Sequence, residues 1–245
     1  MAGHSKWANI RHRKNAQDTK RGKIFTKIIK EITVASRIGG GDVDANPRLR
    51  KAVSNAQSNN MPLENIKRAI HKGTGELDGV NYEEITYEGY GPGGVAILID
   101  VITDNRNRTV ADVRSILNKY NGSMGENGSV SWMFKRRGLI ILDRTESDEK
   151  TFFNIVMDSG AYDFEVNEKN YFVFTEPGIV MDVREFLVSQ GCVVNSADIE
   201  LIPNSYQKVS IEDGYKFQKL MKLLDDNADV NRVYSNFDLE GISSI

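Results

Sequence analysis

Positively charged side chains gather at the start of this 245-residue chain, where they could bind phosphate groups. Residues 1–37 contain ten Lys or Arg residues and two acidic residues, a local net charge of +8. Each Lys or Arg that neutralises a phosphate releases counterions, so affinity accumulates over several such residues. The candidate phosphate-binding residues in this stretch are Lys6, Arg11, Arg13, Lys14, Lys20, Arg21, Lys23, Lys27 and Lys30.

The charge is distributed unevenly along the chain. Residues 1–72 contain 16 basic and 5 acidic residues, net +11, whereas residues 73–245 contain 16 basic and 29 acidic residues, net −13. The net charge of −2 is therefore the sum of a basic N-terminal segment and an acidic remainder of the chain. Most lysine stripes are only solvated helix faces, but this asymmetry favours a polyanionic partner, most often nucleic acid.

Aromatic and cationic side chains are mixed near the N-terminus. Trp7 precedes Arg11, Arg13 and Lys14 by a few residues, and its ring could stack on a nucleic-acid base. The ring could equally hold the N-terminal arm against the helices that follow. The sequence leaves both interpretations of Trp7 open.

Three further groups of cations could extend the positive surface. The first lies at the start of a predicted helix, whose N-terminus itself favours phosphate. The third also begins a predicted helix, where helix capping is an equal alternative. The Lys-Arg-Arg run at 135–137, in a predicted turn, could extend the surface too, and its equal alternative is to protect the end of a strand. The groups are Arg48, Arg50 and Lys51; Lys67, Arg68 and Lys72; and Arg106 and Arg108.

Residues for catalysis or metal binding do not form a recognisable set. His4 and His12 lack the Cys or Glu companions of a metal site, and Asp100 and Asp104 lack further carboxylates at useful spacing. The single cysteine, Cys192, follows the pattern of a reduced, buried core residue. We therefore predict a protein that is not an enzyme and that has no cofactor and no metal.

The hydrophobic pattern of the sequence does not predict a membrane-spanning segment. The apolar runs, such as 95–99, are far too short to span a bilayer. The basic N-terminus contains Asp18 and Trp7, lacks a cleavage-like pattern and is not expected to be a transit peptide. We therefore expect a cytoplasmic protein.

The element that positions most of the candidate cations is a helix predicted over about 21–37. On a helical wheel its Ile and Phe side chains fall on one face, and its cations fall on the opposite face. An Asn-Pro pair at 46–47 predicts a second helix to about 59, and a third begins at 61–62 and closes at Gly73. The cationic stripe of the first helix consists of Lys20, Lys23, Lys27, Lys30 and Arg37.

The remainder of the chain predicts an α+β fold. Residues 138–203 have the order strand, helix, strand, strand, helix, strand, which is the ferredoxin-like order. The flanking pieces cannot each bury a core, so we expect them to complete one another. The predicted architecture is an N-terminal three-helix bundle (1–79) followed by two α+β (ferredoxin-like) domains, with 137–203 inserted between 80–136 and 204–245. A short strand is expected at 129–134.

Several motifs resemble the YebC/PmpR family, and the similarity covers essentially the whole chain. It implies three domains and a role in gene expression: the family is commonly described as probable transcriptional regulators that bind DNA, mitochondrial relatives are translational activators, and bacterial members have been linked to relief of ribosome stalling. The family often carries lysines at 54–58 that this chain lacks. The motifs are GHSKWANI (3–10), RGKIFTK (21–27), NPRLR (46–50), NMP (60–62), YEGYGPGGV (87–95), TDNRNRT (103–109) and GSVSWMF (128–134).

The residues and the resemblance together predict a nucleic-acid-binding regulator of gene expression. The resemblance favours a transcriptional regulator that binds DNA through the basic N-terminal domain. The alternative is a translation factor that binds ribosomal RNA or the ribosome, and the charge pattern alone slightly favours RNA because no helix concentrates base-reading residues. We expect a monomer or a weak dimer with no membrane partner.

Overall fold

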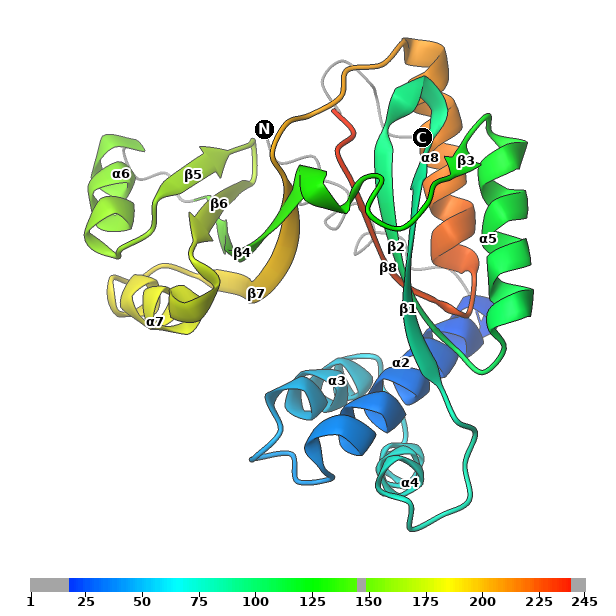
Figure 1. Ribbon diagram of the computed structural model, residues 1–245. Helices are drawn as coiled ribbons and strands as arrows, with labels where there is room; N and C mark the ends of the chain where they lie inside the picture. Colours follow the sequence, from blue (N-terminus) through cyan, green and yellow to red (C-terminus); the bar gives the residue numbers. More distant parts are fainter. Residues whose placement is uncertain (1–17, 145–148, 239–245) are drawn as a thin grey trace.

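The computed structural model describes residues 18–144 and 149–238. Within these residues, helices accompany two antiparallel four-stranded sheets, and this confirms the predicted α+β fold class. Figure 1 shows helices α2 to α4 at the bottom, the first sheet with α5 and α8 at the right, and the second sheet with α6 and α7 at the left.

The helices α2, α3 and α4 pack around one apolar core and form the helical bundle. Ile32, Leu49 and Ile66 are buried where they meet. The side chain of Asn46 accepts a hydrogen bond from the N–H of Leu49 at 3.1 Å, so the predicted Asn-Pro start of the second helix is confirmed. The bounds are α2 Asp18–Gly39, α3 Pro47–Ser58 and α4 Leu63–Thr74.

Gly73 has a different role from the predicted one. It lies inside α4, which continues to Thr74 and is capped by Gly75, whose φ of +83° is left-handed. Gly73 lies against α2, where an added Cβ would come within 2.7 Å of the Ser36 Cβ. This glycine therefore permits a close crossing of two helices and does not terminate one of them.

The first sheet is built from two segments that flank the second sheet in the sequence. Its strand order is β3-β1-β2-β8, and α5 and α8 cover one face, where Ile97, Ile99 and Phe217 are buried. The final strand thus pairs with β2 after the chain has completed the second sheet. The bounds are β1 Glu83–Tyr90, η1 Pro92–Gly94, β2 Ala96–Thr103, α5 Arg106–Lys119, β3 Ser123–Met124, α8 Ile211–Asp226 and β8 Val230–Ser235.

The second sheet has the strand order β5-β6-β4-β7, which is the ferredoxin-like arrangement predicted from the element order. Ile140, Leu142 and Tyr171 pack against α6 and α7 on one face. Cys192, predicted to be buried, is half-buried, and this burial raises the pKa of its thiol. The bounds are β4 Phe134–Asp143, α6 Glu149–Asp158, β5 Asp163–Val166, β6 Asn170–Thr175, η3 Pro177–Ile179, α7 Val180–Ser189 and β7 Val194–Pro203.

The segment that joins the two sheets differs from its prediction. Residues 129–134, expected as a short strand, contain the 3₁₀ turn η2 (Ser131–Met133), and residues 135–137, expected as a turn, belong to β4. The carboxylate of Glu88 accepts the backbone N–H groups of Gly128, Val130 and Ser131 at 2.7, 2.7 and 2.9 Å. These groups therefore cannot join a strand ladder.

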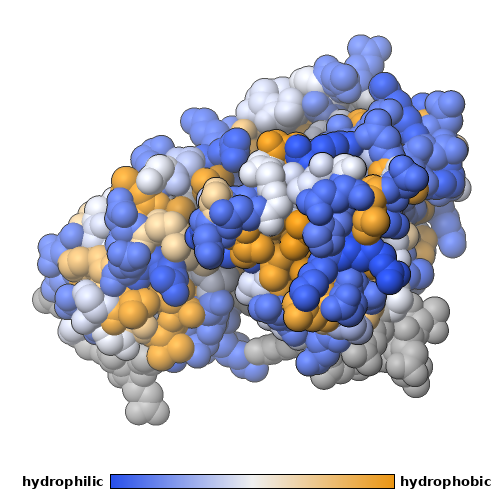
Figure 2. Space-filling model, turned by 90° about the horizontal axis from the view of Figure 1, so that it is seen from below, coloured by the Kyte–Doolittle hydropathy of each residue, from blue (hydrophilic) through white to orange (hydrophobic). Residues whose placement is uncertain are grey.

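Viewed from below, the molecule has two unequal parts with a hollow between them (Figure 2). The smaller part, at the left in both views, contains the second sheet. Ion pairs connect it to the rest: Lys51 of α3 to Asp198 of β7 at 2.5 Å, and Arg232 of β8 to Glu200 of β7 at 3.6 Å. Polar contacts therefore contribute to this junction.

Candidate nucleic-acid interface

The cationic stripe of α2 is not uniformly exposed. Lys23 is exposed, but Lys27 Nζ donates to the carbonyl oxygen of Asp225 at 2.5 Å, in the last turn of α8. The side chain of Lys30 is buried, and its Nζ donates to the carbonyl oxygens of Ile102 and Ala228, both at 3.2 Å. A helix C-terminus attracts cations because its carbonyl groups carry partial negative charge. This part of the stripe thus docks α2 onto the first sheet.

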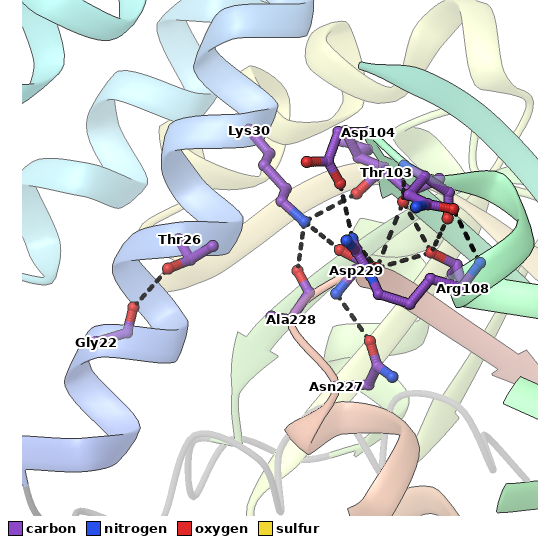
Figure 3. A network of polar contacts seen from close by, with 12 residues as sticks. Gly22, Thr26, Lys30, Thr103, Asp104, Arg108, Asn227, Ala228 and Asp229 are labelled. Atoms are coloured by element: carbon purple, nitrogen blue, oxygen red, sulfur yellow. Dashed lines mark hydrogen bonds and ion pairs between the residues drawn. The ribbon is translucent and has the colours of Figure 1, made fainter. Parts of the chain in front are cut away.

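Asp229 is the carboxylate that receives Lys30 (Figure 3). It also accepts hydrogen bonds from Thr109 Oγ1 at 2.7 Å and from an Arg108 guanidinium nitrogen at 3.0 Å. Burial on its own would raise the pKa of Asp229, but the hydrogen bonds from Lys30, Thr109 and Arg108 outweigh it and lower the pKa to about 2. We call these four residues the Asp229 network.

Arg48 is a second cation that already has partners. Its guanidinium pairs with Glu31 of α2 at 2.7 Å and with Glu84 of β1 at 2.5 Å. These two carboxylates raise the pKa of Arg48 further above its ordinary range. The predicted phosphate contacts Lys30, Arg48 and Arg108 each have a carboxylate partner within this chain, and we leave them out of the proposed interface.

The other predicted cations of α3 are partly engaged. Arg50 is exposed, with its guanidinium bonded to the carbonyl oxygens of Val43 and Asp44. Lys51 forms the ion pair with Asp198 that connects α3 to the second sheet. Neither side chain is as free to meet a phosphate as the sequence pattern suggested.

Arg106 is exposed at the start of α5 and forms no ion pair with a carboxylate among residues 18–144 and 149–238, so its charge is available to a partner. Lys20 and Arg21 lie in the first turn of α2. The N-terminal candidates lie outside the described residues, and their assignment stays a prediction. They are Lys6, Trp7, Arg11, Arg13 and Lys14.

The outer face of α4 carries the clearest group of available cations. Lys67, Arg68 and Lys72 are exposed, while Ile66 and Ala69 of the same helix are buried in the bundle core. Within the described chain, Arg68 and Lys72 have no ion pair, and Lys67 approaches only Glu64, at 3.8 Å. The sequence pattern marks these three residues as an extension of the basic surface, and the structure gives them more exposure than Lys30 or Arg48. We call them the α4 cations.

The carboxylates considered for metal binding have other partners. Asp100 accepts a hydrogen bond from Thr86 Oγ1 at 2.6 Å, and burial raises its pKa. Asp104 pairs with Arg108 at 2.7 Å. Within residues 18–144 and 149–238, no three or more His, Cys, Asp or Glu side chains are grouped as metal ligands would be.

The helices of the described part of the chain do not meet the requirements for crossing a bilayer. None of them combines the length and the apolar character that a membrane span needs.

Two family descriptions match the chain. Residues 5–76 match the TACO1/YebC protein N-terminal domain, and residues 82–237 match the TACO1/YebC second and third domain. The boundary between the two matches falls between α4 and β1.

Full-length relatives and a solved structure agree with these matches. The chain is 55% identical over 239 residues to a probable transcriptional regulatory protein of Geobacter sulfurreducens, covering 98% of this chain and 96% of the relative. It is 48% identical to one of Chlorobaculum tepidum, covering 100% and 98%. The crystal structure of a conserved hypothetical protein from Aquifex aeolicus is similar with a TM-score of 0.78 and 41% identity, covering 92% of this chain and 93% of that one.

Proposed function

This chain belongs to the TACO1/YebC family, and from that premise we propose that it regulates transcription by binding DNA through the helical bundle. The names of its relatives, probable transcriptional regulatory proteins, support the level of gene regulation. The observation that supports this binding surface is that the α4 cations are exposed and largely unpaired.

The charges of the α4 cations suit a phosphate backbone. Lys67, Arg68 and Lys72 project from one helix of a bundle whose core is apolar, so the helix can present them without losing its packing. Lys23 and Arg106 are further exposed cations, at the starts of α2 and α5. Contacts of this type position a protein on DNA but read no sequence by themselves. Sequence preference would have to come from other side chains, among which the N-terminal residues before Asp18 remain candidates.

A translation factor that binds ribosomal RNA is the second candidate function. The α4 cations are phosphate-binding in character, and the C-terminal half of α3 presents Ser54, Asn55 and Ser58 to solvent without a Lys or Arg. A surface of dispersed cations recognises structured RNA through phosphates and shape as readily as it recognises DNA. The surface therefore suits either nucleic acid, and the names of the relatives favour transcription.

A charge-reversal variant tests the proposed surface. Lys67→Glu, Arg68→Glu and Lys72→Glu together should weaken binding to duplex DNA strongly, because three phosphate contacts are lost. The slope of log affinity against log salt should become shallower by about 2 to 3. Binding is measured by anisotropy of a labelled duplex over a range of salt concentrations.

The matched control reverses three exposed lysines of the acidic part of the chain, Lys169→Glu, Lys219→Glu and Lys222→Glu. It changes the net charge equally and should lower affinity much less. Equal losses in the two variants would contradict a local interface on α4. Crosslinking in cells and sequencing of the recovered nucleic acid then separate the candidates: discrete DNA sites support transcription, and one clustered ribosomal RNA site supports translation.

A further inference from the structure

Trp132 is the most exposed large hydrophobic side chain among the described residues, with 68% of its surface accessible. It lies in η2, the turn between β3 and β4 that joins the two sheets (Figure 1). Burying an indole removes a large apolar surface from water, so a partner that covers an exposed one gains binding free energy.

The backbone that carries Trp132 is fixed by hydrogen bonds and packing. The buried carboxylate of Glu88 accepts three backbone N–H groups from residues 128, 130 and 131. Val130 is fully buried against Ala96, Leu98 and Phe134. On the other side of the turn, the side-chain amide of Asn204 donates to the carbonyl oxygen of Trp132 at 3.2 Å. The turn is therefore held in place while its largest apolar side chain faces water.

The indole N–H is already satisfied within the chain. Trp132 Nε1 donates to the carbonyl oxygen of Ser129 at 3.0 Å, and the same oxygen accepts a bond from the Tyr90 hydroxyl at 3.1 Å. The polar edge of the ring is thus used, and what it can offer a partner is its apolar face. A partner that meets this ring would stack on it and would not hydrogen-bond to it.

The charges next to Trp132 define the partner further. Lys135 and Arg136 follow on β4, where successive side chains point to opposite faces; both are exposed and have no ion pair with a described residue. Arg137, the third cation of the run, lies over the ring of Tyr162 at 5.2 Å. The exposed Ser131 precedes the ring, and none of the residues 131–137 is acidic. The partner therefore combines a flat aromatic face with negative charge.

We propose that Trp132 is a stacking platform for an unpaired base of a single-stranded nucleic acid, whose neighbouring phosphates can meet one or other of the exposed cations that follow on β4. Every base has a π-face, so such a contact tolerates many sequences. The inference rests on the proposed function, because it requires that the protein binds nucleic acid. It adds a second contact region, distinct from the α4 cations and located on the segment between the two sheets.

The test uses Trp132 as its own reporter. Trp7 and Trp132 are the two tryptophans of the chain, so the Trp7→Phe variant emits from Trp132 alone. Oligouridylate RNA and oligothymidylate DNA are added as single strands, and each is also added as a duplex with its complement. Binding is followed independently by the anisotropy of a label on the oligonucleotide. We expect saturable quenching of Trp132 by the single strands and little quenching by the duplexes; stronger quenching by one single strand identifies RNA or DNA as the source.

Substitutions measure what the ring contributes. Trp132→Ala should weaken single-strand binding about tenfold, as expected for removal of one stacking aromatic, while Trp132→Phe should retain most of the affinity. Because Trp132 is exposed, neither change is expected to disturb folding, and thermal melting checks this. Phe153→Ala, which removes a 47% exposed aromatic ring from α6, is the matched control and should leave binding unchanged.

Three results would overturn the inference. Wild-type affinity of Trp132→Ala, together with reduced affinity of the α4 charge-reversal variant, removes the stacking contact and leaves the proposed function intact. Unchanged Trp132 emission while the labelled strand is bound means that the ring does not meet a base. Failure to bind any of these nucleic acids removes both the stacking contact and the proposed function.

Discussion

Lys30 and Arg108 reach Asp229 from two different parts of the molecule, one from α2 and the other from α5. Thr109 completes the Asp229 network from within α5. A buried carboxylate with several donors is stable only while all of them are present, because each charge would otherwise be left in a medium of low polarity. At the scale of single residues, the network therefore joins the helical bundle to the first sheet.

Replacement of Asp229 should show this role. Asp229→Asn leaves the buried Lys30 uncompensated, and we expect the free energy of unfolding at neutral pH to fall by about 3 kcal/mol. Asp112→Asn, at an exposed position of α5, is the control and should change it by less than about 0.5 kcal/mol. Denaturant unfolding at several pH values measures both variants.

The pH dependence of the stability of the wild-type protein follows from the same carboxylate, Asp229. The pKa of Asp229 is about 2 in the folded protein, below the ordinary value of about 3.9 for an unfolded aspartate. Its stabilising contribution, about 2.6 kcal/mol, is therefore present above pH 4 and is lost as the pH falls from about 4 to about 2. A stability difference between wild type and Asp229→Asn that stays constant over that interval would contradict this.

Helix α2 is held on two sides. Its apolar residues Ile28 and Ile32 enter the bundle core, and Lys27 and Lys30 reach the end of α8 and the loop behind it. A helical wheel separates these two faces correctly but does not reveal that a negative surface of the same chain covers part of the cationic one. The position of α2 is set in addition by its close crossing with α4 at Gly73.

Two glycine substitutions test that crossing at the scale of the element. In Gly73→Ala the new methyl group meets the Thr33 carbonyl and Ser36, and we expect a loss of about 1 to 3 kcal/mol of stability from overpacking. In Gly22→Ala the methyl group meets nothing within 4 Å, so the better helix propensity of alanine should stabilise α2 by about 0.5 to 1 kcal/mol. Thermal melting compares the two, and shifts of the same sign would speak against the crossing.

The two unequal parts of the whole molecule are joined in two ways. Near η2 the contact is apolar, where Leu201 of β7 packs with Val130 and Phe134. Elsewhere on β7, the ion pair between Lys51 and Asp198 connects α3 to the second sheet. Exposed ion pairs contribute about 0 to 1 kcal/mol and are weakened by salt. The separation of the two parts should therefore respond to charge at this pair.

Reversing the charge of Lys51 should separate the two parts of the molecule without unfolding either of them. Lys51→Glu places two negative charges together and should increase the radius of gyration measured by X-ray scattering, while the melting temperature changes little. Lys67→Glu makes the same charge change on α4, away from the second sheet, and should leave the radius of gyration unaltered. An identical radius in both variants would show that the ion pair does not hold the parts together.

Local sequence features determined the elements of this protein. The Asn-Pro start of α3, the apolar spacing of α2 and the element order of the second sheet were all predictable, because caps and periodicity act over a few residues. The family was likewise recognisable from the sequence, because its motifs are contiguous runs of residues. Predictions failed where a distant group intervenes: Glu88, some 40 residues away, takes the N–H groups that a strand at 129–134 would have needed.

The tertiary structure alone decided which cations remain available to a partner. The carboxylate that meets Lys30 lies 199 residues away in the sequence, and Arg48 meets one from α2 and one from β1. Charge counting cannot identify such pairs, because ion pairing depends on distance in space and the sequence records only order along the chain. For the same reason the exposure of the α4 cations and of Trp132 became visible only once the helices and sheets had packed.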